Sequence, residues 1–240
     1  MTNYVLLNNV DHKDLKIIGK RSAEYGDNVM FAMTFPFEFR NIQSYYPIFF
    51  QKNAETGQFY PVALFGFQDK ENLFLSDEGW DASYIPLMID RNPFLIGFQQ
   101  AKGQDEGSKQ RVVSIDMDNP RANKTEGESV FLEHGGRTDF LERITGILEA
   151  IDNGHENSKV FVESLLEHDL LESFSLEITL NDGSQNQLLG FYTINEEKLQ
   201  ELNSEALGKL NSQGCLQPIF MIVASHSRIK TLIDKKNSQT

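Results

Sequence analysis

Two strand-like stretches, an aromatic-rich apolar one and one with alternating apolar and polar residues, are each interrupted by turn-forming residues and predict two β-hairpins. The first runs from residue 45 to residue 67 and turns around Asn53 and Gly57, which tolerate the positive φ angles of a tight turn. The second runs from residue 174 to residue 194 and turns at Asn181-Asp182-Gly183-Ser184. Further strand-like segments are 29–35, 94–98 and 111–115. The pattern predicts a mostly antiparallel, aromatic-rich sheet.

After residue 137 the apolar period becomes helical. The predicted stripe consists of Phe140, Leu141, Ile144, Ile147, Leu148 and Ile151. Asp139 can cap this helix and Gly154 can end it, after which Asn157 can cap a second helix. The two helices would form an αα-hairpin, and Asn195 would cap a later, leucine-rich helix. Short helices are also expected at 37–44 and 84–89, and the segment 215–223 is expected to be a buried strand or helix. The fold class is therefore α+β, with helices mainly in the second half.

A chain of 240 residues with 40% hydrophobic content is long enough to bury a core as one domain. The polar connector at 116–128 contains the turn signal Asn119-Pro120. We expect a single domain over residues 1–240, with a possible sub-division at this connector. The subdivision would separate an aromatic, β-rich part from an acidic, helical part. A polar loop is expected at 101–108.

The net charge of −13 is concentrated in one region of the chain. Residues 126–205 carry 18 acidic and 4 basic side chains, a balance of −14. Such a charge repels phosphate backbones, so no nucleic-acid partner is predicted. The acidic stretch is interpreted either as solvated helix faces or as a docking face for a basic partner.

No apolar run approaches the roughly 20 residues that span a bilayer, so no membrane span is predicted. The N-terminus lacks the basic and apolar regions of a Sec signal peptide. We therefore expect a cytoplasmic location, with leaderless export to the cell surface as the alternative. Cys215 is the only cysteine, which excludes an internal disulfide.

Aromatic residues are concentrated before the acidic region: 19 of the 26 Phe, Tyr and Trp residues lie within the first 100 positions. Such side chains dominate both cores and interfaces. Two interpretations stay open, a Phe-rich β core and an apolar pocket or groove.

Motifs for phosphate loops, dinucleotide folds, nucleophile elbows and zinc helices do not occur in the sequence. The five histidines have no metal-binding spacing. The sequence His134-Gly135-Gly136-Arg137 is interpreted as a turn before a helix, and Asp116-Met117-Asp118 as part of the polar connector. No catalytic residue, metal ion or cofactor is predicted.

The candidate ligand or partner site consists of Trp80, Asp81, Tyr84 and Arg91. On a helix that begins at residue 84, Tyr84 would precede Arg91 by two turns, with Trp80 just before it. Two aromatic rings beside a guanidinium can grip a planar or anionic ligand. In the alternative, Trp80 packs in the core and Arg91 pairs with Asp81 or with a backbone carbonyl.

A run of short motifs resembles the SapC family of bacterial proteins. The motifs are Tyr46-Pro47-Ile48-Phe49-Phe50, Glu55-Thr56-Gly57, Pro61-Val62-Ala63-Leu64, Glu71-Asn72-Leu73-Phe74, Trp80-Asp81-Ala82-Ser83-Tyr84-Ile85-Pro86 and Arg91-Asn92-Pro93-Phe94. The second half is similar too, through its acidic helical segment and its Gly190-Phe191 hairpin. The resemblance implies an association with bacterial surface-layer proteins. It supplies no catalytic residues.

Together these features predict a non-catalytic binding or accessory protein with a protein or peptide partner. Two alternatives stay open: an enzyme with a dispersed, motif-less active site, and a structural surface-layer component. A homodimer also stays open.

Overall fold

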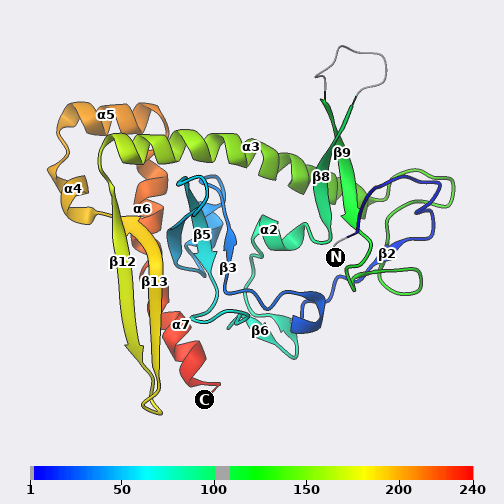
Figure 1. Ribbon diagram of the computed structural model, residues 1–240, viewed down its shortest axis with the longest axis horizontal. Coiled ribbons are helices and arrows are strands. Elements are labelled where there is room, and N and C mark those ends of the chain that lie inside the picture. The colour runs from blue at the N-terminus through cyan, green and yellow to red at the C-terminus, as the bar shows by residue number, and fades with distance from the viewer. Residues whose placement is uncertain (1–2, 101–108, 240) are drawn as a thin grey trace. The chain divides into compact units, whose positions relative to one another are not determined.

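The computed structural model describes residues 3–100 and 109–239, and its chain divides into two compact units (Figure 1). The first unit comprises Met1–Asp27 and Leu87–Asp152, and the second comprises Asn28–Pro86 and Asn153–Thr240. Antiparallel sheets and helices placed mainly in the second half confirm the α+β class. The connector at 116–128 lies inside the first unit. In the described part of the chain, no helix has the length and apolarity needed to cross a membrane.

The second unit is built on a five-stranded sheet in the order β12-β13-β4-β5-β3, and all its pairings are antiparallel. The strands are β3 (Phe31–Met33), β4 (Ile48–Lys52), β5 (Phe59–Leu64), β12 (Leu171–Thr179) and β13 (Gln185–Ile194). A small two-stranded sheet joins β6 (Leu75–Ser76) to β7 (Gly79–Trp80). Both predicted hairpins are confirmed, as β4–β5 and β12–β13.

The turn of the first hairpin has the chemistry that the sequence indicates. The side-chain carbonyl of Asn53 accepts hydrogen bonds from the backbone N–H groups of Glu55 and Thr56, each at 2.9 Å. Gly57 has a φ of 69° and donates its N–H to the carbonyl of Asn53. The turn therefore satisfies its own backbone groups and presents the tip of β4–β5 as an ordered loop.

The second hairpin contains an irregularity that the alternating pattern does not predict. Between Phe174 and Leu176 of β12, the partner strand β13 advances by one extra residue. Gly190, with a φ of 77°, lies in the extra stretch, as expected for a bulge that needs a left-handed residue.

The core of the second unit surrounds β4 and β5. Ile48, Phe49 and Phe50 are all fully buried although neighbouring strand residues point to opposite faces of a sheet. Both faces of β4 are therefore covered. On one face the ring of Phe50 lies 6.4 Å from that of Phe161, and on the other Phe49 stacks on His226 at 5.2 Å. Continuous burial explains why this strand is an unbroken apolar run.

Helices of the second half complete this unit. They are α4 (Glu196–Glu201), α5 (Ser204–Ser212), α6 (Leu216–Ser225) and α7 (Arg228–Asn237), and α1 (Phe39–Ile42) precedes β4. Asn195 caps α4 as predicted, because its side chain accepts a hydrogen bond from the backbone N–H of Lys198 at 2.9 Å. Asn203 caps α5 in the same way, through the N–H of Ala206. Helix α6 contacts β4, β13 and α1.

The predicted αα-hairpin is wrong: a single helix, α3, runs over 29 residues from Asp139 to Glu167 (Figure 1). Gly154 lies inside this helix and does not end it. A Cβ atom at Gly154 would come within 2.7 Å of the Phe35 ring and 2.8 Å of the Phe37 ring. The glycine is thus explained by close packing against two stacked rings. In the sequence, a glycine required for packing looks the same as one that ends a helix.

The first unit contains two small antiparallel sheets, in the orders β1-β9-β8 and β10-β2-β11. Their strands are β1 (Tyr4–Leu6), β2 (Lys16–Ile17), β8 (Phe94–Gln100), β9 (Lys109–Asp116), β10 (Ala122–Asn123) and β11 (Glu128–Ser129). The strands expected at 94–98 and 111–115 are confirmed as β8 and β9. The loop expected at 101–108 lies outside the described residues. A short 3-10 helix at Ala23–Tyr25, helix α2 (Leu87–Asp90) and the first part of α3 complete the unit.

The short helix near residue 84 begins later than predicted. Helix α2 covers Leu87–Asp90 only, so Tyr84 is not helical. Pro86 accounts for the difference, because a proline disfavours helical geometry in the residue before it and is well placed just ahead of a first turn.

Candidate functional site

Trp80 and Tyr84 join one hydrogen-bond network in the interior of the second unit. The indole Nε1 of Trp80 donates to the hydroxyl of Tyr46 at 2.7 Å, and that hydroxyl donates to the backbone carbonyl of Tyr84 at 2.5 Å. The Tyr84 hydroxyl in turn donates to Glu38 Oε1 at 2.8 Å. The Thr34 hydroxyl donates to the other carboxylate oxygen, and Glu38 is 1% exposed. Burial raises the pKa of Tyr46 well above its ordinary value.

This network satisfies the polar ends of large side chains that pack in the core. The ring of Tyr46 makes edge contacts with Phe65, Phe74 and Trp80. Buried hydroxyl and indole groups are costly unless they are hydrogen-bonded. The arrangement therefore accounts for Trp80 and Tyr84 as structural partners of Tyr46.

The other two predicted site residues have partners outside this hydrogen-bond network. Asp81 is exposed and forms an ion pair with Lys235 of α7. Arg91 belongs to the first unit, where its Nη1 donates to the carbonyl of Phe94 at 2.7 Å. Burial lowers the pKa of the Arg91 guanidinium. The structure thus brings Trp80 and Tyr84 together and gives Asp81 and Arg91 separate partners; a ligand at these four residues stays a prediction.

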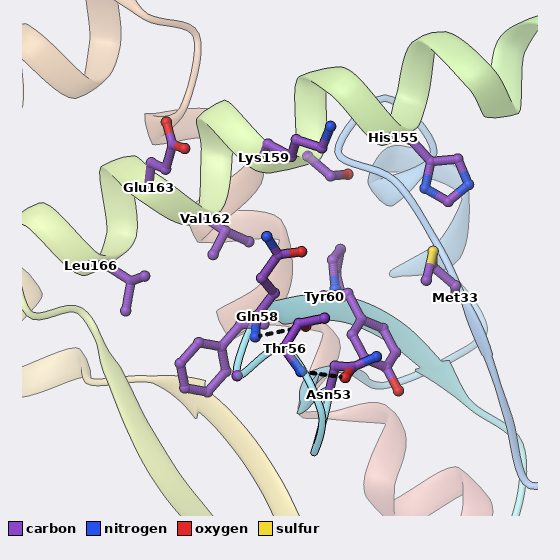
Figure 2. A pocket seen from close by; sticks show the side chains of 14 residues that line it. Met33, Asn53, Thr56, Gln58, Tyr60, His155, Lys159, Val162, Glu163 and Leu166 are labelled. Atoms are coloured by element: carbon purple, nitrogen blue, oxygen red, sulfur yellow. Dashed lines mark hydrogen bonds between the residues drawn. The ribbon is translucent and has the colours of Figure 1, made fainter.

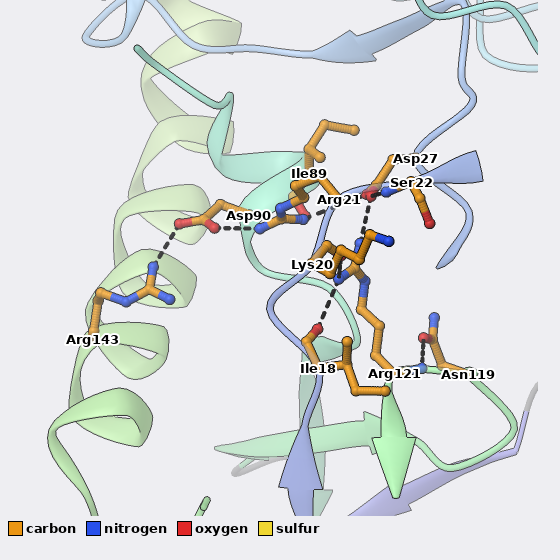
Figure 3. Close-up of polar contacts among 10 residues, drawn as sticks. All are labelled: Ile18, Lys20, Arg21, Ser22, Asp27, Ile89, Asp90, Asn119, Arg121 and Arg143. Carbon is orange, nitrogen blue, oxygen red and sulfur yellow. Dashed lines mark hydrogen bonds and ion pairs between the residues drawn. The ribbon is translucent and has the colours of Figure 1, made fainter. Parts of the chain in front are cut away.

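A buried ion-pair cluster lies inside the first unit (Figure 3). Arg121 and Asp27 are each 1% exposed and are joined by a 2.5 Å contact. Arg121 also donates to the backbone carbonyls of Ile18 and Lys20. Arg21 bridges Asp27 and Asp90. Burial lowers the pKa of the Arg121 guanidinium, and the Asp27 carboxylate opposes that change.

Every charge of this cluster faces another one across a short distance. Arg143 completes it from α3, with Nη1 2.6 Å from Asp90 Oδ2. Ion pairs of this kind hold segments in register, and they leave little unpaired charge for a ligand. We therefore regard the cluster as a structural element of the first unit.

A pocket lies within the second unit, between the tip of the β4–β5 hairpin and α3 (Figure 2). Its volume is about 530 Å³, within the roughly 300–1,000 Å³ that ligand sites occupy. The lining residues are Met33, Asn53, Thr56, Gly57, Gln58, Phe59, Tyr60, Pro61, His155, Ser158, Lys159, Val162, Glu163 and Leu166. We call it the hairpin–helix pocket. A smaller pocket of about 410 Å³ in the first unit is lined by residues around Leu132 and Arg137.

The walls of the hairpin–helix pocket differ in character. From α3, Val162 and Leu166 point toward the hairpin, as Figure 2 shows. Leu166 is 49% exposed, and a large apolar side chain open to solvent beside other apolar groups is typical of an interaction site. Phe59 and Pro61 add apolar surface from β5. One part of the pocket is therefore an apolar seat that opens to solvent at Leu166.

Polar groups surround this seat. His155, Lys159 and Glu163 are spaced four residues apart on α3, which places them on one face of the helix. The Oγ atom of Ser158 is buried and has no hydrogen-bond partner among the described residues. An unsatisfied buried hydroxyl in a pocket wall is a group that a ligand atom can satisfy. The pocket thus offers both an apolar contact surface and polar groups that fix orientation.

This pocket was not predictable from the sequence, because its two walls come from segments far apart in the chain. The turn at Asn53–Gly57 was explained completely by turn geometry. The polar spacing of His155, Lys159 and Glu163 was a usable signal, but the predicted break near Gly154 and Asn157 concealed it. Among residues 3–100 and 109–239, no three His, Cys, Asp or Glu side chains are grouped to hold a metal ion.

The fold defines an α+β class of protein with a five-stranded antiparallel sheet and a hairpin–helix pocket. The family model for SapC matches residues 7–232, nearly the whole chain. The protein therefore belongs to the SapC family. Comparisons with curated proteins and with solved structures find no match.

Proposed function

We propose that this SapC-family protein is a binding or accessory protein, and that the hairpin–helix pocket binds a segment of a protein or peptide partner. The observation that carries the proposal is the apolar seat in which the exposed Leu166 lies beside the buried Val162, bordered by polar groups. Peptide-recognition grooves combine an apolar seat for one side chain with polar groups that fix the backbone. The surface-layer association that the family resemblance implies is part of the same proposal.

The hairpin suits this role because its tip carries polar groups beside an ordered backbone. The loop between β4 and β5 is held by Asn53, so the groups of Thr56 and Gln58 have fixed positions at the pocket edge. A pre-ordered wall lowers the entropy that binding must overcome. The pocket therefore supports recognition of a short segment.

Selection from a random peptide library displayed on phage tests the proposal. Peptides enriched on the wild-type protein would be synthesised and their affinities measured against Leu166→Asp, which places a charge in the apolar seat. We expect affinity to fall about tenfold or more, because interface anchors of this kind contribute more than about 1 kcal/mol. The matched control is Leu189→Asp, since Leu189 is 59% exposed on β13 and does not line the pocket.

The proposal requires that the library yields peptides that bind, and that Leu166→Asp lowers their affinity. Absence of enriched peptides would count against the proposal. So would an equal loss of affinity in the two variants, because it would place the peptides elsewhere.

A second candidate, an enzyme with a dispersed site, is favoured by one observation. Tyr60, His155, Lys159 and Glu163 all line the same pocket, and convergent titratable groups are a mark of active sites. A panel of peptide, ester and glycoside substrates separates the candidates: turnover that His155→Gln abolishes, with the fold intact, would favour the enzyme.

A further inference from the structure

Charges around the hairpin–helix pocket are unequally paired. Lys159 lies 2.9 Å from Glu156, one turn before it on α3. Glu167, one turn beyond the pocket, pairs with Lys209 of α5. Glu163 lines the pocket, and in the described part of the chain it has neither an ion pair nor a hydrogen bond. Among the lysine and glutamate side chains that line the pocket, the unmatched charge is therefore negative.

This carboxylate is next to the apolar seat. Glu163 and Leu166 are three residues apart on α3, so they are neighbours on the helix surface. Both are exposed, and Val162 beside them is buried. A ligand side chain that rests on Val162 and Leu166 therefore brings its neighbouring group close to Glu163.

The wider charge distribution has the same sign. Residues 126–205 have a balance of −14, and the whole chain has a net charge of −13. A field of this sign concentrates cationic partners near the surface and repels anionic ones. An anionic ligand would meet unfavourable potential at the rim, whereas a cationic group would meet an unpaired carboxylate.

Resting on the proposed function, we infer that the bound partner segment carries an apolar residue next to a lysine or arginine. The apolar side chain lies against Val162 and Leu166, and the cation pairs with Glu163. Arginine suits the site because its guanidinium can form two hydrogen bonds with one carboxylate. Glu163 is then the residue that determines the charge preference of the pocket.

Defined peptides test this preference directly. The probes are capped, fluorescently labelled hexapeptides of glycine and serine with a central Leu-Arg pair, and matched peptides with Leu-Glu or Ala-Arg. Fluorescence anisotropy at low salt measures their affinity for the whole chain. We expect Leu-Arg to bind about fivefold to tenfold more tightly than Leu-Glu, the range for one exposed ion pair against one repulsion.

A charge swap supplies the decisive comparison. In Glu163→Lys the order of the two peptides should reverse, whereas Glu149→Lys should preserve it. Glu149 is an exposed residue of the same helix, does not line the pocket, and gives the same change in net charge. Added salt should reduce the preference, because exposed charges are screened.

The outcomes separate the inference from the function on which it rests. If Leu-Arg and Leu-Glu bind equally, and Leu166→Asp weakens both, the pocket binds peptides and the charge preference is wrong. If Glu149→Lys reverses the order as well, the preference belongs to net charge and Glu163 is not its source. If none of the peptides binds and the phage selection also fails, the proposed function itself is overturned.

Discussion

The two compact units stabilise their interiors by different means. In the first unit, the Arg121–Asp27 ion pair is deeply buried, with Arg21 and Asp90 attached to it. In the second unit, the interior consists of aromatic rings around β4 and β5, and its polar groups are satisfied through the Tyr46 hydroxyl. One interior relies on charge pairs and the other on packed rings with a few hydrogen bonds.

Comparing the two interiors with the pocket shows which polar groups are available to bind a ligand. In both interiors, the carboxylates of Asp27 and Glu38 and the hydroxyl of Tyr46 already have protein partners. The pocket, by contrast, combines an exposed leucine with an exposed carboxylate that has no partner among the described residues. A residue that is chemically suited to recognition, such as Trp80, is not available for it once its polar atom is used inside the core.

Replacing Arg121 with methionine gives the largest expected effect and tests the ionic interior. The Asp27 carboxylate would keep its longer, 3.5 Å contact with Arg21 but lose the 2.5 Å contact. Removing one partner of a buried pair costs about 3–5 kcal/mol. Urea unfolding measures the loss, with the exposed Arg137→Met as the control. Equal destabilisation by the two variants would remove the contrast between the units.

Two glycines of α3 test the aromatic interior. Gly154→Ala should destabilise by about 1–3 kcal/mol, because the new methyl group collides with the stacked rings of Phe35 and Phe37. Gly146 lies in the part of α3 that belongs to the first unit. Apart from its chain neighbours and the backbone of its own helix, no described atom lies within 4 Å of the position that a Cβ atom would occupy. Gly146→Ala should therefore stabilise by about 0.5–1 kcal/mol. Thermal unfolding of both variants measures these effects. Melting temperatures that shift in the same direction would contradict this packing.

The smallest expected effect concerns His226, whose ring stacks on Phe49. Burial lowers its pKa below the ordinary 6.5, an effect that the nearby Glu196 carboxylate opposes. As the pH falls through 6.5, the unfolded chain gains a proton that the folded chain does not, so stability is lost. Melting temperatures between about pH 7.5 and about pH 5.5 should fall less steeply for His226→Gln. The control variant His134→Gln, at an exposed histidine, should keep the wild-type dependence of melting temperature on pH. If His226→Gln also keeps it, His226 is not the source of that dependence.

Local chemistry decided which features the sequence could predict. The hairpins were predictable because strand-like residue patterns and the turn residues Asn53, Gly57 and Gly183 act over a few positions. The unbroken α3 was not, because the reason for Gly154 lies in the distant rings of Phe35 and Phe37. The pocket depends on the same long-range meeting of hairpin and helix.

The chain passes between the two units three times, after Asp27, Pro86 and Asp152. The pairing of β2 with β11 and of β4 with β13 closes each unit across a long intervening segment. No single cut therefore yields a fragment that contains one complete unit. Chimeras between relatives would have to exchange discontinuous blocks, and helix α3 would need a junction inside its own length.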